Sequence, residues 1–338
     1  MSFIEYREYN PEFINAFLNY QAFITFKSNS TVDEMYLDIR TFLRYIKYIN
    51  TSNNKEFKIE EFRKIDIKDL TLQDMNKITF NTINDFIYFL KYSLDNSAKS
   101  RNRKLASIKK LFAYLDSQNL ITSNPTKNIN RAKVEKRQPK YLNLNESKEL
   151  LSKTILSENK YKTRNYAITC IFFNCCIRLN ELISINLSDI KFDERTLKIH
   201  GKGNKERILY LNDAVLEAIT NYLEVRPQLN SAYPDYKALF LSNRNQRISR
   251  RNVQQIIKNE ITHTFNEIKK NIHTHSLRHT GATLMYDINN TDIKVIQEIL
   301  GHISISSTQI YTHVSDKRLK ELMQNFNILD SEARNYEK

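Results

Sequence analysis

The chain has 338 residues, of which 41% are hydrophobic, so it has enough apolar side chains to build folded cores in about two domains. Its 52 lysines and arginines against 38 acidic residues give a net charge of +14, which favours a polyanionic partner over a small neutral ligand. No apolar run reaches the roughly 20 residues needed to span a bilayer, and the first residues lack a signal-peptide pattern, so we expect a cytoplasmic protein with no membrane partner.

Apolar residues in the first part of the chain recur at helical spacing. This period is found in four segments: 10–27, 31–49, 82–92 and 97–115. We therefore predict that residues 1–130 form a small all-helical domain.

The fourth of these helices begins a strongly basic region. Residues 97–140 hold 12 lysines or arginines and 2 acidic residues, and residues 131–140 have the composition of a linker. A run of charge is usually a solvated face, but the scarcity of carboxylates here favours DNA phosphates as partners. The candidate DNA contacts in this region are Lys99, Arg101, Arg103, Lys104, Lys109, Lys136 and Arg137.

Residues 141–329 are predicted to form a second domain, followed by a polar tail at 330–338. Asn145 is a candidate N-cap of its first helix, and the apolar segment 166–177 indicates a buried central helix. Short alternating segments predict three antiparallel strands at 190–192, 196–200 and 207–211. The expected fold class is mainly α, with a helical N-terminal domain and an α+β second domain containing a small three-stranded antiparallel sheet.

A second group of basic residues precedes a predicted helix that includes residues 253–257. Phosphate contact and a solvated surface are both consistent with it. Its members are Arg244, Arg247, Arg250 and Arg251.

Cysteine and histidine usage argues against bound metal or a disulfide framework. The chain has three cysteines, two of them adjacent (Cys175 and Cys176), so we expect reduced core thiols. His273, His275 and His279 lie close in sequence but lack accompanying carboxylate or cysteine ligands. We therefore expect neither a metal nor another cofactor.

Three fragments near the end of the chain together offer a base, cationic groups and a nucleophile for attack on a phosphodiester. They are His275-Ser276-Leu277-Arg278, Gly301-His302 and Tyr311. A tyrosine hydroxyl, with an unperturbed pKa of about 10, needs a base and nearby positive charge to attack at neutral pH. His275 fits the base, and Arg278 fits the charge.

Two further residues complete this chemistry. Arg178 can join Arg278 at the non-bridging phosphate oxygens, where negative charge builds in the transition state. Lys202, on a turn between two glycines, could protonate the leaving oxygen. Lys205 on the same turn is a competitor for that role.

In this order the motifs CCIRLNEL, HGKGNKERILYL, HTHSLRHTGATLM and LGHISISSTQIYTHV resemble those of the tyrosine recombinase family, the integrases and Xer-type recombinases. Two departures concern backbone shape: Cys176 stands where the family usually has glycine, and Thr274 where proline is common. The roles that the resemblance implies are Tyr311 as nucleophile, Arg178 and Arg278 as phosphate clamps, His275 as general base, Lys202 as general acid and His302 as a hydrogen-bond donor to the phosphate. It also implies Glu181 as support for these residues, and we interpret His279 as a packed residue beside Arg278.

The resemblance further implies a site-specific DNA recombinase that works without a cofactor through a 3′-phosphotyrosine and a Holliday junction. The N-terminal domain would be the family's SAM-like core-binding domain, and four protomers would assemble on two double-stranded DNA sites. A C-terminal helix would dock on a neighbouring subunit or pack against its own domain; its apolar residues are Leu319, Leu322, Met323 and Phe326. A type IB topoisomerase-like DNA relaxation and a non-catalytic DNA-binding protein are the alternatives.

Overall fold

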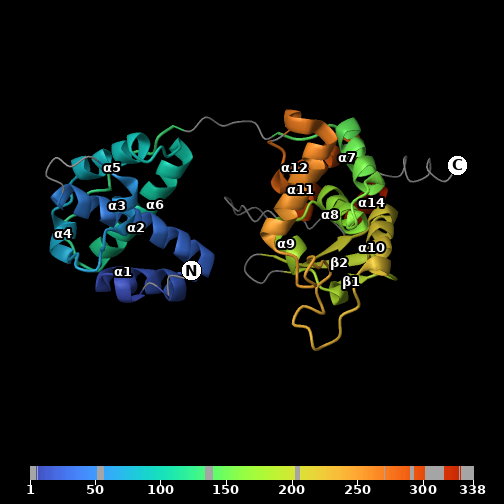
Figure 1. Cartoon of the computed structure of the whole chain (residues 1–338), viewed down its shortest axis with the longest axis horizontal. Helices are drawn as coiled ribbons and strands as arrows, with labels where there is room; N and C mark the ends of the chain where they lie inside the picture. The colour runs from blue at the N-terminus through green and yellow to red at the C-terminus, as the bar shows by residue number, and fades with distance from the viewer. Residues whose placement is uncertain are drawn as a thin grey trace. The chain divides into compact units, whose positions relative to one another are not determined.

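The protein forms two compact units, residues 1–137 and 138–338, each described by itself (Figure 1). No helix among the residues described is long and apolar enough to cross a membrane. The computed structural model describes residues 5, 7–51, 57–133, 140–201, 206–269, 271–289, 293–300, 316–326 and 328.

The N-terminal unit is helical, as its apolar spacing predicts. Ser97 caps the basic helix by accepting a hydrogen bond from the Ser100 backbone N–H at 3.2 Å. Two short helices, α3 and α4, were not predicted, because five or six residues are too few to show a helical period. The elements are η1 (Arg7–Tyr9), α1 (Glu12–Asn19), the π-helical turn η2 (Tyr20–Ile24), α2 (Asn29–Thr51), α3 (Ile59–Lys64), α4 (Leu72–Asn76), α5 (Phe80–Tyr92) and α6 (Ala98–Ser117).

An aromatic core holds these helices together. Phe42 of α2 meets Phe86 of α5 and Phe112 of α6 in edge-on contacts, with ring centroids 5.1 and 6.2 Å apart. All three side chains are fully buried. Such pairs stabilise a core beyond the area that they remove from water.

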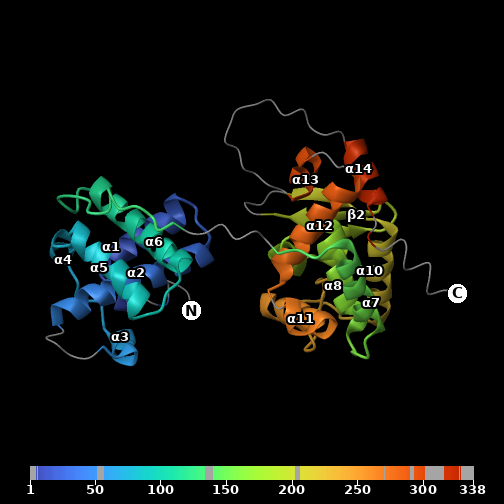
Figure 2. The same cartoon turned by 90° about the horizontal axis from the view of Figure 1, so that it is seen from above.

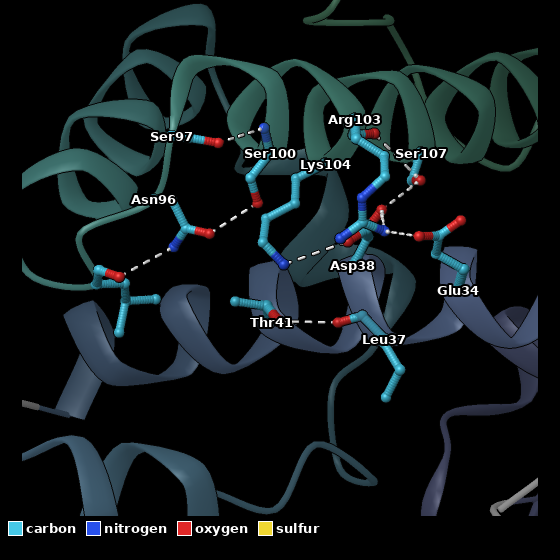
Figure 3. A network of polar contacts seen from close by, with 11 residues as sticks. Glu34, Leu37, Asp38, Thr41, Asn96, Ser97, Ser100, Arg103, Lys104 and Ser107 are labelled. Atoms are coloured by element: carbon cyan, nitrogen blue, oxygen red, sulfur yellow. Dashed lines mark hydrogen bonds and ion pairs between the residues drawn. The ribbon is translucent and has the colours of Figure 1, made fainter. Parts of the chain in front are cut away.

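A buried carboxylate joins α2 to the basic helix α6 (Figure 3). Asp38 of α2 is completely buried, and it accepts hydrogen bonds from Arg103 Nη1 at 2.8 Å, Lys104 Nζ at 3.2 Å and Ser107 Oγ at 2.9 Å. Arg103 also pairs with the exposed Glu34 at 3.2 Å. Two of the six basic side chains of α6 thus bind a carboxylate of their own domain.

The C-terminal unit is mainly helical with one small sheet. In it, α7, α10 and α12 all pack on α8, which the two views show inside the unit (Figures 1 and 2). The elements are α7 (Leu144–Leu156), α8 (Lys162–Cys175), α9 (Leu179–Ser184), η3 (Leu187–Asp189), β1 (Ile190–Lys191), β2 (Thr196–His200), β3 (Glu206–Tyr210), α10 (Asp213–Val225), α11 (Arg250–Phe265), η4 (Asn266–Lys269), α12 (Thr274–Asn289), α13 (Ile293–Leu300) and α14 (Asp316–Asn325).

The start of α7 differs from the prediction by two residues. The N-cap is Asn143 rather than Asn145: its side chain accepts the Glu146 backbone N–H, and the Glu146 carboxylate accepts the Asn143 N–H, both at 2.9 Å. Both asparagines are suitable caps, but only Asn143 has a carboxylate three residues later, which closes the reciprocal capping box.

The predicted sheet is confirmed. Its strands run antiparallel in the order β1-β2-β3, and Leu197 pairs with Leu209 and Ile199 with Arg207 across β2 and β3. Leu197, Ile199 and Leu209 are buried, so one face of the sheet covers the core.

The end of α8 has a backbone shape that suits glycine, the residue that the resemblance leads us to expect at position 176. Cys176 adopts the left-handed conformation, with φ of 48°, and a residue with a Cβ there is destabilised by about 1 kcal/mol. The nearby Gly281 of α12 cannot carry a side chain, because a Cβ would lie 2.0 Å from the Phe173 carbonyl oxygen of α8. This close approach sets α12 directly against the end of α8.

The segment from α14 to Ile328 packs against the C-terminal unit itself in this single chain. Met323, Phe326 and Ile328 are buried in its core, and Leu322 lies partly buried against that core. The Phe326 carbonyl accepts a hydrogen bond from Asn212 Nδ2 at 2.7 Å. The Leu319 side chain lies outside the described part of the structure.

The Asp38 network gives a stability test for the N-terminal unit. We expect Asp38→Asn to lower the free energy of unfolding by about 3 kcal/mol, because a buried ion pair that loses one partner leaves cations without compensation. Glu34→Gln is the matched control, since this exposed partner of Arg103 should contribute at most about 1 kcal/mol. Urea denaturation of both variants measures the difference, and equal losses would contradict a special role for Asp38.

Candidate active site

Helix α9 positions the first two site residues. The chain leaves α8 through the left-handed Cys176 and begins α9 with Arg178 at the N-cap. Glu181, one turn later, is 4% exposed. Its Oε2 accepts the Arg178 backbone N–H at 2.7 Å, and its Oε1 accepts Arg178 Nη1 at 2.9 Å.

A second arginine reaches the same carboxylate from the sheet. Arg207 of β3 donates from Nη1 to Glu181 Oε1 at 3.0 Å and from Nη2 to Oε2 at 2.9 Å. This bidentate arrangement is the strongest geometry for an arginine and a carboxylate. It fastens β3 to α9.

A third arginine comes from α12. Arg278 is 5% exposed, and its Nη1 lies 3.8 Å from Glu181 Oε2, within ion-pair range but too far for a hydrogen bond. Its Nη2 donates to the Leu300 carbonyl at 2.7 Å, which ties α12 to the end of α13. Buried Nη1 has no hydrogen-bond partner among the described residues.

Three guanidinium groups therefore surround one carboxylate, a local charge of +2. Burial alone would raise the pKa of Glu181, but hydrogen bonds from Arg207 and Arg178 and the charge of Arg207 bring this pKa below its ordinary value. Burial, followed by the charge of Arg178, lowers the pKa of Arg278 to about 10. The Glu181 carboxylate and the Arg278 guanidinium are therefore both charged at neutral pH, and the excess positive charge of the cluster suits a phosphate.

His275 lies on α12 one turn before Arg278, as the spacing predicts. Partial burial lowers its pKa, and the nearby charges of Arg278, His273 and His279 lower it further. The imidazole is therefore neutral at pH 7 and able to accept a proton.

The neighbouring histidines have packing contacts of their own. His273 Nδ1 accepts the Ser276 backbone N–H at 3.2 Å, which helps to close the first turn of α12. The ring of His279 meets Tyr141 edge-on at 6.0 Å, so His279 packs against the start of the unit.

The cysteines are buried free thiols, as predicted. Burial raises the pKa of the Cys176 thiol to about 12 despite the opposing charge of Arg278. Burial likewise raises the pKa of Cys170 and Cys175. A protonated, enclosed thiol is a poor nucleophile, so these residues do not compete for attack on a substrate.

Several predicted site residues lie outside the described part of the chain. They are Lys202, its competitor Lys205, His302, Tyr311, Lys136 and Arg137. Their assigned roles stay predictions.

The predicted DNA contacts on α6 differ in their surroundings. Lys99 is exposed, and Lys109 is half-buried. Arg101 donates to the Asn96 carbonyl at 2.6 Å. Lys104 has a side chain only 12% exposed and bound to Asp38, whereas the side chain of Arg103 is 40% exposed.

The second basic group divides in the same way. Arg244, Arg250 and Arg251 are exposed, the last two in the first turn of α11. Arg247 instead donates to the carbonyls of Ile183 and Ile185 at 2.9 and 3.2 Å and to the Asn186 side chain. Its guanidinium holds the segment before α11 against the end of α9.

Sequence reasoning missed Arg207. The available signal was strand alternation: Arg207 and Leu209 share a face of β3, and Leu209 is buried while Ile208 between them is 57% exposed. An arginine on the core-facing side of a strand needs a buried acidic partner. Glu181, which the sequence analysis already placed at the site, was the candidate for that partner.

Comparison with known proteins agrees with this geometry. Residues 140–318 match the phage integrase family. The chain is 39% identical to a tyrosine recombinase XerC of Caldanaerobacter subterraneus subsp. tengcongensis, over 95% of this chain and 88% of the relative. It is 37% identical to the XerC of Thermodesulfovibrio yellowstonii, over 68% of this chain and 76% of the relative.

Solved structures support the same fold. The crystal structure of the XerH site-specific recombinase bound to a palindromic difH substrate, a post-cleavage complex, has a TM-score of 0.64 at 20% sequence identity, covering 92% of this chain and 81% of that one. The pre-cleavage XerH complex with difH has a TM-score of 0.61 at 23% identity, covering 87% and 78%. The chain belongs to the phage integrase family, whose members are tyrosine recombinases. It is a DNA strand transferase that performs site-specific recombination.

The lowered pKa of Glu181 predicts a pH-dependent contribution to stability. Because its folded-state pKa lies below the unfolded value of about 4.3, the carboxylate stabilises the fold fully above that pH and loses its effect as the pH falls through the folded-state pKa. We expect Glu181→Gln to lower the free energy of unfolding by about 3 kcal/mol at pH 7, and by clearly less at pH 3.5. Urea denaturation at the two pH values measures the difference.

The control for this experiment is Glu194→Gln, which removes a mostly exposed partner of Lys191 of strand β1. Its stability should stay close to that of the parent at both pH values. A Glu181→Gln defect of equal size at pH 3.5 and pH 7 would contradict the ionised carboxylate.

Proposed function

We propose that the cluster around Glu181 is the phosphate-binding half of the recombinase active site. The observation that carries this assignment is the convergence of Arg178, Arg207 and Arg278 on one carboxylate, with Arg278 Nη1 lacking a hydrogen-bond partner among the described residues. A non-bridging phosphate oxygen would supply an acceptor for that buried donor. It would also balance the excess positive charge.

In this proposal the reaction is a transesterification. The Tyr311 hydroxyl oxygen attacks the phosphorus, the bond from phosphorus to the 5′ oxygen breaks, and a 3′-phosphotyrosine forms. Neutral His275 takes the tyrosine proton, and Lys202 protonates the leaving 5′ oxygen. Arg178 and Arg278 stabilise the charge on the non-bridging oxygens, with His302 as a further donor. A 5′-hydroxyl from another strand can reverse these steps, so no external energy source is required.

Family membership favours site-specific recombination over topoisomerase-like relaxation and over a non-catalytic DNA-binding role. The substrate in this proposal is double-stranded DNA, which both the core-binding domain (residues 1–130) and the catalytic domain would contact. The side chains best placed for phosphate contact are exposed: Lys99, Arg244, Arg250 and Arg251. A cytoplasmic location stays a prediction.

The covalent step can be tested directly. We expect the protein to form an adduct on fragmented host genomic DNA that survives denaturing detergent, and sequencing the trapped DNA then gives the recombination site. On a nicked duplex carrying that sequence, Tyr311→Phe should abolish the adduct, because it removes the attacking oxygen. The control Tyr286→Phe changes an exposed tyrosine of α12 and should leave adduct formation unchanged. No adduct with the parent protein would favour the non-catalytic alternative.

We also propose a tetramer on two DNA sites, joined through a Holliday junction. The C-terminal helix that carries Leu319, Leu322, Met323 and Phe326 would link the protomers, although Met323 and Phe326 of this single chain are buried in their own domain. Light scattering of the complex with the recovered duplex should give a mass of four chains and two duplexes. A complex whose mass stays at two chains and one duplex at saturating protein would contradict the tetramer.

A further inference from the structure

Strand β3 turns an arginine inward and an isoleucine outward. The Arg207 side chain is 18% exposed, whereas Ile208 is 57% exposed. Arg207 pairs across the sheet with Ile199, which is 1% exposed. Hydrophobic burial alone would favour the opposite orientation, so the polar contact of Arg207 must compensate for it.

In the described part of the structure, the hydrogen bonds of the Arg207 side chain all go to Glu181. Both Nη atoms bind the carboxylate, and the buried Nε has no partner among the described residues. Each Glu181 oxygen also accepts one hydrogen bond from Arg178, through its side chain or its backbone N–H. Arg207 thus provides half of these four bonds and fixes the plane of the carboxylate.

Without Arg207, Glu181 would lose the only one of its three arginines that is bound to it bidentately. Its carboxylate would then have only Arg178 and Arg278 as charged partners, and a phosphate also requires these two arginines. The local charge would fall from +2 to +1. Arg207 also connects α9 to β3, which begins at Glu206, four residues after Lys202 in the chain.

We propose that Arg207 is a positioning residue for strand cleavage: by binding both oxygens of Glu181 it fixes the carboxylate that in turn holds Arg178 and lies beside Arg278. It acts through Glu181 and does not touch the substrate. This inference rests on the proposed assignment of Arg178 and Arg278 to the phosphate.

The experiment measures single-turnover adduct formation on the nicked duplex that genomic trapping provides. The rate constant is independent of how much protein is active, whereas the amplitude reports the active fraction. A residue needed only for folding therefore lowers the amplitude and leaves the rate constant unchanged. We expect Arg207→Gln to lower the rate constant about 10- to 100-fold, because small misplacement of catalytic groups has effects of this order.

Three further measurements separate positioning from direct contact. Affinity for the same duplex, measured by fluorescence anisotropy in the Tyr311→Phe background, should change by less than about threefold, since no contact of Arg207 with a phosphate is lost. Arg207→Lys should recover only part of the rate, because an ammonium cannot bind both oxygens in a fixed plane. The double variant Glu181→Gln/Arg207→Gln should be no slower than the slower single variant.

Arg195→Gln is the matched control. Arg195 precedes β2 and pairs with Asp213 at 2.6 Å, its side chain is 45% exposed, and its described ion pair does not involve Glu181 or the arginines around it. Its rate constant should equal that of the parent. A parent-like rate for Arg207→Gln, or additive slowing in the double variant, would overturn the inference. Failure of the parent itself to form an adduct would instead overturn the proposed function.

Discussion

The buried carboxylate of Glu181 is the interaction on which the catalytic unit depends. Arginines are seldom buried without a partner, because burial removes their hydration. Here α9, β3 and α12 each bring a guanidinium to the same place, and one negative charge allows this. Since one carboxylate opposes three cations, the fold is held together while the site keeps the positive charge that a phosphate needs.

Apolar packing brings these charges together. Helix α8 is buried on nearly all sides, so its end is fixed by the surrounding helices. The left-handed Cys176 then directs the chain into α9 and its N-terminal Arg178. Gly281 lets α12 approach the Phe173 carbonyl closely, which places Arg278 near α9. The geometry of the charged site is thus set by one backbone turn and one missing side chain.

The sequence predicted the longer elements because each repeats its apolar period several times, as in α2 and α6. It predicted Arg178, His275 and Arg278 because their motifs occur in order. It did not predict Arg207, because the motifs carry no pairing information and a strand of five residues shows only two periods of alternation. The cap at Asn143 was missed for a related reason: the choice between two asparagines depends on the position of Glu146, three residues beyond the true cap.

The number of basic residues overestimates the surface available to DNA, because in both units some of these side chains are bound to partners within the protein. In the N-terminal unit Asp38 binds Lys104 and Arg103, and in the C-terminal unit backbone carbonyls bind Arg247. A basic side chain that already has short internal hydrogen bonds must break them before it can bind a phosphate. Net charge therefore identifies the class of partner, whereas the internal partners of each cation determine which side chains can contact it. Glu181 differs from these cases because its three arginines leave positive charge uncompensated at the place where the proposed phosphate would bind.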